Sequence, residues 1–220
     1  GVERAIALVM DDDPVVDSES DRWANDEINM KDVKLAGGTF TVLRDCYDDA
    51  SVSRYGAGDE SAKLNINVAT REQLARLPRI TPAVVAAIID WRDDNEQPEP
   101  DGIERGYYES LPHPYTIRNA PMRTMREMLL VRGVTPELFY GEDTNVNGVL
   151  DDNENDGDAG DPPDNADGRL DRGWYAWLTP YSFEKNVNPL SGQQRLNLSS
   201  ADAGTLAQRL GLETWAAESI

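Results

Sequence analysis

The sequence predicts an α+β fold, in which helices and short strands follow one another along the chain. Three observations support this class. Apolar residues recur at helical spacing in residues 2–9, apolar and polar side chains alternate in residues 37–52 and 62–68, and helix-capping patterns recur between residues 69 and 140. Each of these elements can be justified from its own residues.

The first helix is predicted in "GVERAIALVMDDD". Val2, Ala5, Ile6 and Val9 form one apolar stripe, and the helix is expected to end in the acidic run that follows. The chain opens at Gly1 inside this pattern and without an initiator Met. We therefore expect that a preceding segment has been removed.

A helix-hairpin-helix is predicted in "LARLPRITPAVVAAIIDWR". Thr70 and Gln73 form a capping box for its first helix, because the hydroxyl and the amide can satisfy two backbone donors reciprocally. Thr81 caps the second helix, with Pro82 at the first helical position. The same devices return in "TMREMLLVRG" and "TPELF", so further helices are expected there.

Part of this pattern is repeated near the end of the chain. "LNINVATREQLA" at 64–75 matches "LNLSSADAGTLA" at 196–207 at equal spacing, which a strand leading into a capped helix would explain, although a chance match stays open. A strand is also predicted in "GWYAWLTPYSF". The predicted domains are the first helix and strands at 1–68, an inserted helical domain at 69–140, an acidic loop at 141–172, and a return to the sheet with a C-terminal helix at 173–220.

The composition argues against several classes of function. The chain has 21 Lys and Arg against 41 Asp and Glu, a net charge of −20, and such a surface repels the phosphates of nucleic acids. Cys46 is the only cysteine, and His113, which lies between two prolines, is the only histidine. Catalysis by a nucleophile and a histidine base would have to use His113, so an enzyme is the least favoured of the function classes considered. No run of about 18 apolar residues is present.

The acidic segment contains a twelve-residue calcium-loop pattern, "DTNVNGVLDDNE", from Asp143 to Glu154. Calcium requires six to eight oxygen ligands, which a curled loop can supply and Gly148 allows to turn sharply. The alternative is a plain acidic linker. The predicted ligands are the side chains of Asp143, Asn145, Asn147, Asp151 (through water) and Glu154, and the carbonyl of Val149.

A second loop, "DPPDNADGRLDRG", is incomplete by the same pattern. Asn165, Asp167 and Asp171 stand at ligand positions, but Pro163 would be first and Trp174 last. It could share ligands with the first loop, for which Asp156, Asp158 and Asp161 are candidates, or it could be a solvated turn. The sequence thus predicts one calcium ion and allows a second.

The helix-hairpin-helix resembles the repeat of the competence protein ComEA, which grips DNA through glycines in its hairpin. Here Arg79 and Thr81 stand in place of those glycines, and the acidic stretch "DWRDDNEQPEPD" follows the second helix. We therefore expect the fold of the hairpin without binding of nucleic acid. A ComEA-like DNA-binding protein stays an alternative.

A larger part of the chain resembles GspK, a minor pseudopilin family of type II secretion. The similar stretches are "DESAKLNINVAT", "IIDWRDDN", "GIERGYYESLPHPYTIRNAPMRTMREMLLVRGVTPELF" and "RLNLSSA", while "GVERAIALV" resembles the outer half of a pilin helix. The resemblance implies a pilin-like N-terminal helix and small antiparallel sheet, with an inserted all-helical helix-hairpin-helix (SAM-like) domain, to which the calcium-binding loop is added. The Asp143–Asp171 insertion has no counterpart in the family pattern.

The resemblance also implies a function. Members of the family are non-enzymatic calcium-binding subunits that cap the pseudopilus tip together with other minor pseudopilins, here GspI- and GspJ-like proteins. They are anchored in the inner membrane through an N-terminal segment missing from this chain and expose this domain to the periplasm. A calcium-dependent binding module of another envelope machine is a further alternative.

Overall fold

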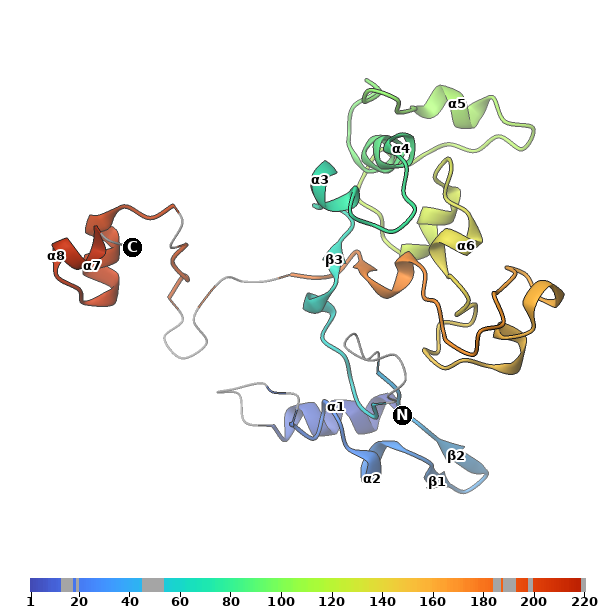
Figure 1. Cartoon of the computed structure of the whole chain (residues 1–220), viewed down its shortest axis with the longest axis horizontal. Coiled ribbons are helices and arrows are strands. Elements are labelled where there is room, and N and C mark those ends of the chain that lie inside the picture. Colours follow the sequence, from blue (N-terminus) through green and yellow to red (C-terminus); the bar gives the residue numbers. More distant parts are fainter. Residues whose placement is uncertain are drawn as a thin grey trace. The chain divides into compact units, whose positions relative to one another are not determined.

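The structure is a computed structural model that describes residues 1–12, 18, 20–44, 54–183, 187, 193–197 and 200–218. The chain divides into two compact units, Gly1–Phe183 and Glu184–Ile220. Figure 1 shows the course of the chain through both. Cys46 and the second half of the strand predicted at 37–52 lie outside the described residues.

The N-terminal helix forms as predicted, as α1 (Val2–Met10). Its buried residue is Leu8, whereas Val2, Ile6 and Val9 are 74%, 48% and 51% exposed. Most of the predicted apolar stripe therefore faces outward within its own unit. No helix among the described residues has the length and apolar character needed to cross a membrane.

A short helix and a hairpin follow α1. α2 (Glu27–Met30) begins at Asp26, whose carboxylate accepts a hydrogen bond of 3.0 Å from Asn29 N. β1 (Val33–Leu35) and β2 (Gly38–Phe40) then pair antiparallel. The strand predicted around Phe40 is thus present, and its partner comes directly before it.

The second sheet differs from the prediction. After the 3₁₀ turn η1 (Glu60–Ala62), β3 (Leu64–Asn65) pairs with β4 (Leu178–Thr179) in parallel, and the first part of the strand predicted at 173–183 is the 3₁₀ turn η5 (Trp174–Ala176). The prediction of one small antiparallel sheet is therefore wrong for the described residues, which form one antiparallel and one parallel pair. The parallel pairing is possible because a long helical crossover joins β3 to β4.

Both helices of the predicted hairpin form with the predicted caps. α3 (Arg71–Leu74) begins at Thr70, whose hydroxyl accepts from Gln73 N at 3.2 Å while Gln73 Oε1 accepts from Thr70 N at 2.8 Å. α4 (Pro82–Arg92) begins at Thr81, whose hydroxyl accepts from Val84 N at 3.3 Å. Local capping chemistry thus sets where the two helices begin.

The core of the larger unit is built around α4. Because this helix carries apolar residues on nearly all sides, it is buried on nearly all sides. α5 (Arg105–Glu109) adds Tyr108, whose ring meets Trp91 edge-to-face at 5.4 Å between centroids. Leu74, Ile88, Met128, Phe139, Trp174 and Leu178 complete the fully buried centre.

The segment after the hairpin is helical but more tightly wound than predicted. The helix expected after Thr124 is the 3₁₀ helix η2 (Met125–Leu130), and α6 (Pro136–Phe139) follows. Asn67 ties this region to β3, because its amide accepts from Met122 N at 2.7 Å and donates to Met122 O at 3.0 Å. The acidic segment then contains two short 3₁₀ turns, η3 (Asp152–Glu154) and η4 (Gly157–Ala159).

The smaller unit is a helical hairpin of α7 (Ala203–Leu210) and α8 (Thr214–Ala217). It agrees with the internal match in the sequence. Asp202 caps α7 where Thr70 caps α3, and Gly211 adopts a positive φ of 65° where Arg79 adopts 58°. Leu206 is buried like its counterpart Leu74, and α8 begins at the position that corresponds to the start of α4. The internal match in the sequence therefore corresponds to two similar helical hairpins, α3–α4 and α7–α8.

Candidate metal sites

The first acidic loop, residues 143–154, curls around the side chain of Asp143. Asn147 N and Gly148 N each donate to its carboxylate at 2.9 Å, and Gly148 has a φ of 72°, which the turn requires. Asp143 is only 7% exposed. The residue predicted to open the calcium loop therefore lies at its centre.

The other predicted ligands converge on the same place. Asp151 Oδ2 accepts from the side-chain amides of Asn145 at 2.7 Å and Asn147 at 2.8 Å. Glu154, 2% exposed, accepts from Thr144 N at 2.9 Å and from Asp151 N at 3.2 Å. The loop thus brings together the five predicted side-chain ligands.

The sixth predicted ligand is the carbonyl of Val149. The backbone N–H of the same residue donates to Asn147 Oδ1 at 2.7 Å. The carboxylates of Asp143 and Glu154 are both negatively charged when ionised, and they repel each other. Burial raises the pKa of Asp143 above its ordinary value and the charge of Glu154 adds to this, against the hydrogen bonds from Gly148 and Asn147. A bound cation would relieve this repulsion.

The second acidic loop, residues 163–174, repeats three side-chain contacts of the first loop. Asp167 N donates to Asn165 Oδ1 at 2.9 Å, Arg169 N to Asp167 Oδ1 at 2.8 Å, and Asn165 Nδ2 to Asp171 Oδ2 at 3.1 Å. The first loop has the same three contacts at the corresponding positions, at 2.9, 2.7 and 2.7 Å. The backbone agrees as well, since Gly168 has a φ of 77°.

Two residues outside the second loop take the places of its missing end ligands. Asn155 Oδ1 accepts from Gly168 N at 3.0 Å, as Asp143 accepts from Gly148 N. Glu142 accepts from Asn165 N at 3.1 Å and from Asp171 N at 2.8 Å, and it is 7% exposed. Asn155 thus stands in for Pro163 and Glu142 for Trp174.

This arrangement could not be found by reading a twelve-residue window. Trp174 itself is buried in the core, where its Nε1 donates to Pro78 O at 2.9 Å. The sequence suggested Asp156, Asp158 and Asp161 as shared ligands, but the contacts that match the first loop come from Asn155 and Glu142. The signal that could have pointed to Glu142 is its place directly before Asp143.

Two backbone hydrogen bonds join the start of the acidic segment to its end. Glu142 N donates to Asp171 O at 2.8 Å, and Gly173 N donates to Tyr140 O at 2.9 Å. A side chain at Gly141 or Gly173 would lie within 2.4 Å of the opposite backbone, so only glycine fits this crossing. The start and the end of the acidic segment are therefore held side by side.

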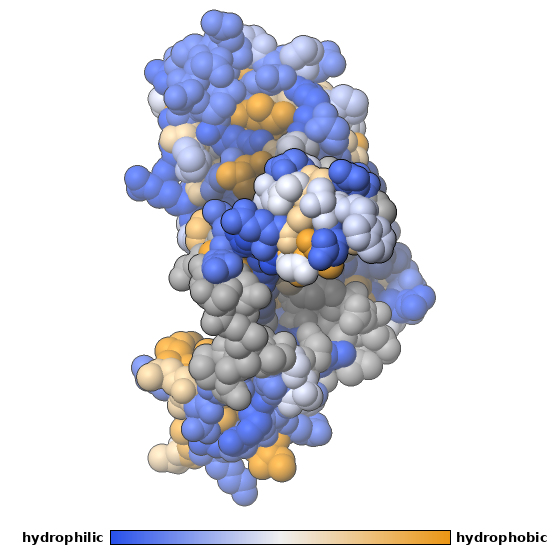
Figure 2. All heavy atoms as spheres, turned by 90° about the vertical axis from the view of Figure 1, so that its left-hand side faces the viewer, coloured by the Kyte–Doolittle hydropathy of each residue, from blue (hydrophilic) through white to orange (hydrophobic). Residues whose placement is uncertain are grey.

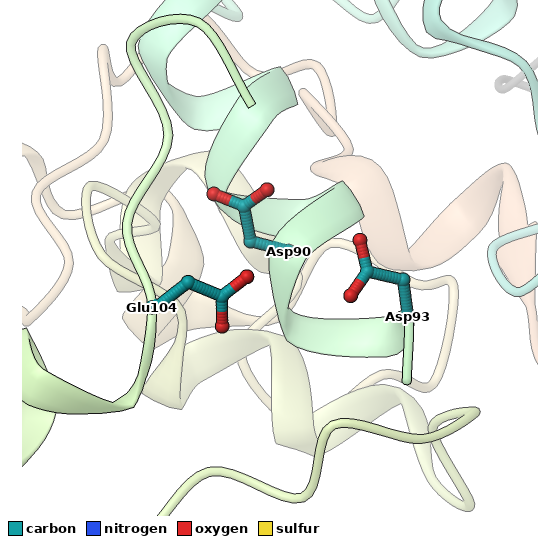
Figure 3. A group of neighbouring side chains, drawn as sticks. All are labelled: Asp90, Asp93 and Glu104. Carbon is teal, nitrogen blue, oxygen red and sulfur yellow. The ribbon is translucent and has the colours of Figure 1, made fainter. Parts of the chain in front are cut away.

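A third group of carboxylates was missed by the sequence analysis. Asp90, Asp93 and Glu104, together called the carboxylate cluster, offer oxygen atoms that all lie within 4.8 Å of one another (Figure 3). In the sequence, "DWRDDN" is part of the acidic stretch at the end of the second predicted helix. Asp90 is instead fully buried.

Three arginines of the hairpin, Arg71, Arg79 and Arg92, are engaged within the protein itself. Arg79 donates to Glu137 O at 3.0 Å, Arg71 pairs with Glu99 at 2.5 Å, and the guanidinium of Arg92 donates to the carbonyls of Ile66 and Ala69. The surface seen in Figure 2 is mainly hydrophilic, with separate apolar patches. With a net charge of −20, these arginines do not form a basic patch that would attract phosphate.

Residues 62–140 match a model of the family described as "Type II secretion system (T2SS), protein K". These matched residues are called here the protein K domain. The resemblance predicted from "LNINVAT", "DWRDD" and "NAP" is confirmed over this part of the chain. The family is a component of a secretion system of the bacterial envelope and not a family of enzymes. The acidic loops begin after the protein K domain ends.

The solved structures give a weaker likeness. A chain in the crystal structure of the GspK-GspI-GspJ complex from the enterotoxigenic Escherichia coli type 2 secretion system is 18% identical, with a TM-score of 0.31. The match covers 35% of this chain and only 34% of that chain, so it carries no argument about fold or partners. The curated proteins include no match.

Proposed function

We propose that this protein is a minor pseudopilin of a type II secretion system, a non-enzymatic subunit at the tip of the pseudopilus. The observation that supports this most strongly is the protein K domain at residues 62–140. The proposed partners are the counterparts of GspI and GspJ in the same secretion system. The proposed location is the periplasmic side of the inner membrane.

The course of the chain supports a tip position. β3 leads directly into the protein K domain, and β4 brings the chain back to lie beside β3 after both acidic loops. The helical domain and the loops are therefore one large insertion between two paired strands. Such a bulky insertion would prevent another subunit from stacking above this one.

The exposed side of α1 supplies a surface for neighbouring subunits. Val2, Ile6 and Val9, called here the outer face of α1, border an apolar groove that is completed by Val42 and Leu43. Burial of apolar area is the main favourable contribution to subunit association. We propose that the outer face of α1 packs against another minor pseudopilin.

Calcium is proposed as a stabilising ligand of both acidic loops. Their shared contacts, with Asn155 and Glu142 completing the second loop, support two ions of the same kind. With a dissociation constant near 10⁻⁴ M and millimolar calcium, each ion would add about 1.4 kcal/mol to the free energy of unfolding. That is enough to hold a loop in one conformation, and it requires no catalytic role.

The function is tested by complementation of secretion. Deleting the gene in its host is expected to stop the release of proteins that depend on type II secretion, and the full-length parent gene is expected to restore it. Ile6→Glu places a charge on the outer face of α1 and is expected to restore little, whereas the control Val68→Glu, at a site 74% exposed in the protein K domain, restores fully. Normal secretion in the deletion strain would contradict the proposal.

A further inference from the structure

The sequence contains a single asparagine that is followed by glycine, Asn147 in the first acidic loop. In such a pair the backbone nitrogen of the glycine can attack the side-chain amide carbon of the asparagine, because glycine has no Cβ atom to hinder the approach. Asn147 is exposed, so water reaches its side chain. The pair Asn147–Gly148 therefore has the residue types and the exposure that this chemistry requires.

The closed loop holds the two reacting groups on different partners. Gly148 N, the attacking atom, donates to Asp143 Oδ2 at 2.9 Å. The amide of Asn147 is bonded at both ends, since its Oδ1 accepts from Val149 N at 2.7 Å and its Nδ2 donates to Asp151 Oδ2 at 2.8 Å. The attack therefore requires that these hydrogen bonds break first.

The carboxylate of Asp143 opposes the attack in a second way. The nitrogen of Gly148 has to give up its proton and becomes negatively charged as it attacks. In the closed loop this charge would develop against a carboxylate that is only 7% exposed, and two like charges in a buried place repel each other strongly. Local opening of the loop removes this repulsion and frees both reacting groups together.

We propose that Asn147 is a site of spontaneous deamidation, and that opening of the first acidic loop controls its rate. Gly148 N forms a bond to Asn147 Cγ, which closes a five-membered succinimide ring. The bond from Cγ to the side-chain nitrogen breaks, and this nitrogen leaves as ammonia with the proton that Gly148 N has lost. Water then opens the ring at either of its two carbonyls, which gives aspartate or isoaspartate. Water is the only co-reactant.

The second acidic loop shows how an aspartate is accommodated at this place. Its corresponding pair is Asp167–Gly168, and Gly168 has a φ of 77° where Gly148 has 72°. Asp167 Oδ1 accepts from Arg169 N at 2.8 Å, as Asn147 Oδ1 accepts from the residue two positions later. The aspartate product therefore fits the turn, and it loses only the hydrogen bond that the amide of Asn147 donates, because a carboxylate cannot donate.

The isoaspartate product changes the loop more severely. It adds a methylene group to the main chain between the first half of the loop and the second half, which contact each other through Asn145 Nδ2 and Asp151 Oδ2 at 2.7 Å. The lengthened chain cannot keep this contact and the turn at Gly148 together. Deamidation therefore converts an opened loop into one that no longer closes in the same way.

The dependence of the rate on calcium rests on the proposed function, in which the first acidic loop binds this ion. An ion that binds only the closed loop, at about ten times its dissociation constant, makes opening about tenfold rarer. Deamidation should slow by the same factor, because only the open loop reacts.

The site is tested by incubating the whole chain at pH 8 in chelator, in millimolar calcium, and in urea with chelator. Mass spectrometry of digested samples locates each asparagine that has gained –OH in place of –NH₂. Asn147 is expected to react before Asn145, which is also exposed but is followed by the β-branched Val146. The rate at Asn147 should be highest in urea, lower in chelator and about tenfold lower again in calcium.

Two variants test the control by the loop. Asp143→Ala removes the acceptor of Gly148 N and is expected to raise the rate in chelator towards the rate in urea. The matched control is Asp152→Ala, which removes an exposed acid from the same loop and is expected to react as the parent does.

Three results would overturn the proposal. They are a rate at Asn147 no higher than at Asn145 in chelator, the same rate at Asn147 in the folded chain and in urea, and no difference between Asp143→Ala and Asp152→Ala. Equal rates in calcium and in chelator, both below the rate in urea, would uphold the deamidation site and contradict the first calcium site instead. Failure of the proposed function is thereby distinguished from failure of this inference.

Discussion

The half-buried side chain of Glu104 leads to a quantitative prediction about how stability depends on pH in the absence of calcium. Its pKa is raised from 4.5 to about 6, first by burial and then by neighbouring acids. A shift of this size corresponds to about 2 kcal/mol, since one pKa unit is 1.36 kcal/mol. Glu104 is not fully buried, so solvent screening reduces the expected effect to about 1 kcal/mol.

The sign follows from which state binds the proton more tightly. Because the folded state has the higher pKa, protonated Glu104 favours folding, and this contribution is complete below pH 4.5 and lost as the pH rises through 6. Glutamine imitates the protonated acid at every pH. In chelator, Glu104→Gln should therefore be more stable than the parent by about 1 kcal/mol at pH 7.5, and the difference should vanish near pH 4.

The assay is urea unfolding of both proteins in chelator at pH 4, 5, 6 and 7.5. Glu109→Gln, an exposed acid at the end of α5, is the matched control and should show no pH-dependent difference from the parent. A Glu104→Gln variant that is less stable than the parent at pH 7.5, or equally stable throughout, would refute the reasoning.

Three further predictions concern the acidic loops and the hairpin. Glu154→Gln should lower the gain in unfolding free energy on adding calcium by about 1.4 kcal/mol, measured by urea unfolding with and without chelator, and an unchanged gain would contradict the first calcium site. Glu142→Gln should lower the gain by a similar amount through the second loop, although Glu142 lies outside it, and no effect would contradict the assignment of Glu142 as its end ligand. Thr81→Ala removes the cap of α4 and should cost about 1 kcal/mol with or without calcium, seen as a lower melting temperature, whereas equal melting would show that the cap contributes nothing.

The features that could be predicted from the sequence are those decided by neighbouring residues. The capping boxes at Thr70 and Thr124, the cap at Thr81 and the first acidic loop all form from residues no more than eleven positions apart. Their hydrogen bonds are local, so the pattern of residue types is sufficient. The N-terminal helix was predicted for the same reason.

The features that could not be predicted depend on residues far apart in the chain. The parallel pairing of Leu64 with Leu178 is set by how the insertion folds, which no local pattern records. Glu142 and Asn155 reach the second loop only because the acidic segment turns back on itself. The burial of Asp90 could not be predicted either, because the loop that covers it comes later in the sequence.

The apolar residues of α1 show a different limit of prediction from sequence. Helical spacing identified the stripe of Val2, Ile6 and Val9, but spacing does not say whether a stripe faces the core or a partner. The exposure of these side chains shows that the core of their own unit does not cover them. Their use as a subunit contact stays a prediction.

The central claim is that this chain assembles with other minor pseudopilins, and mixing experiments test it most directly. The periplasmic parts of the GspI- and GspJ-like proteins of the same secretion system would be combined with this chain in calcium and weighed by light scattering after gel filtration. We predict one species with the mass of one copy of each protein, and its loss on Ile6→Glu but not on Val68→Glu. Separate elution of the three parent proteins at micromolar concentration would contradict the account.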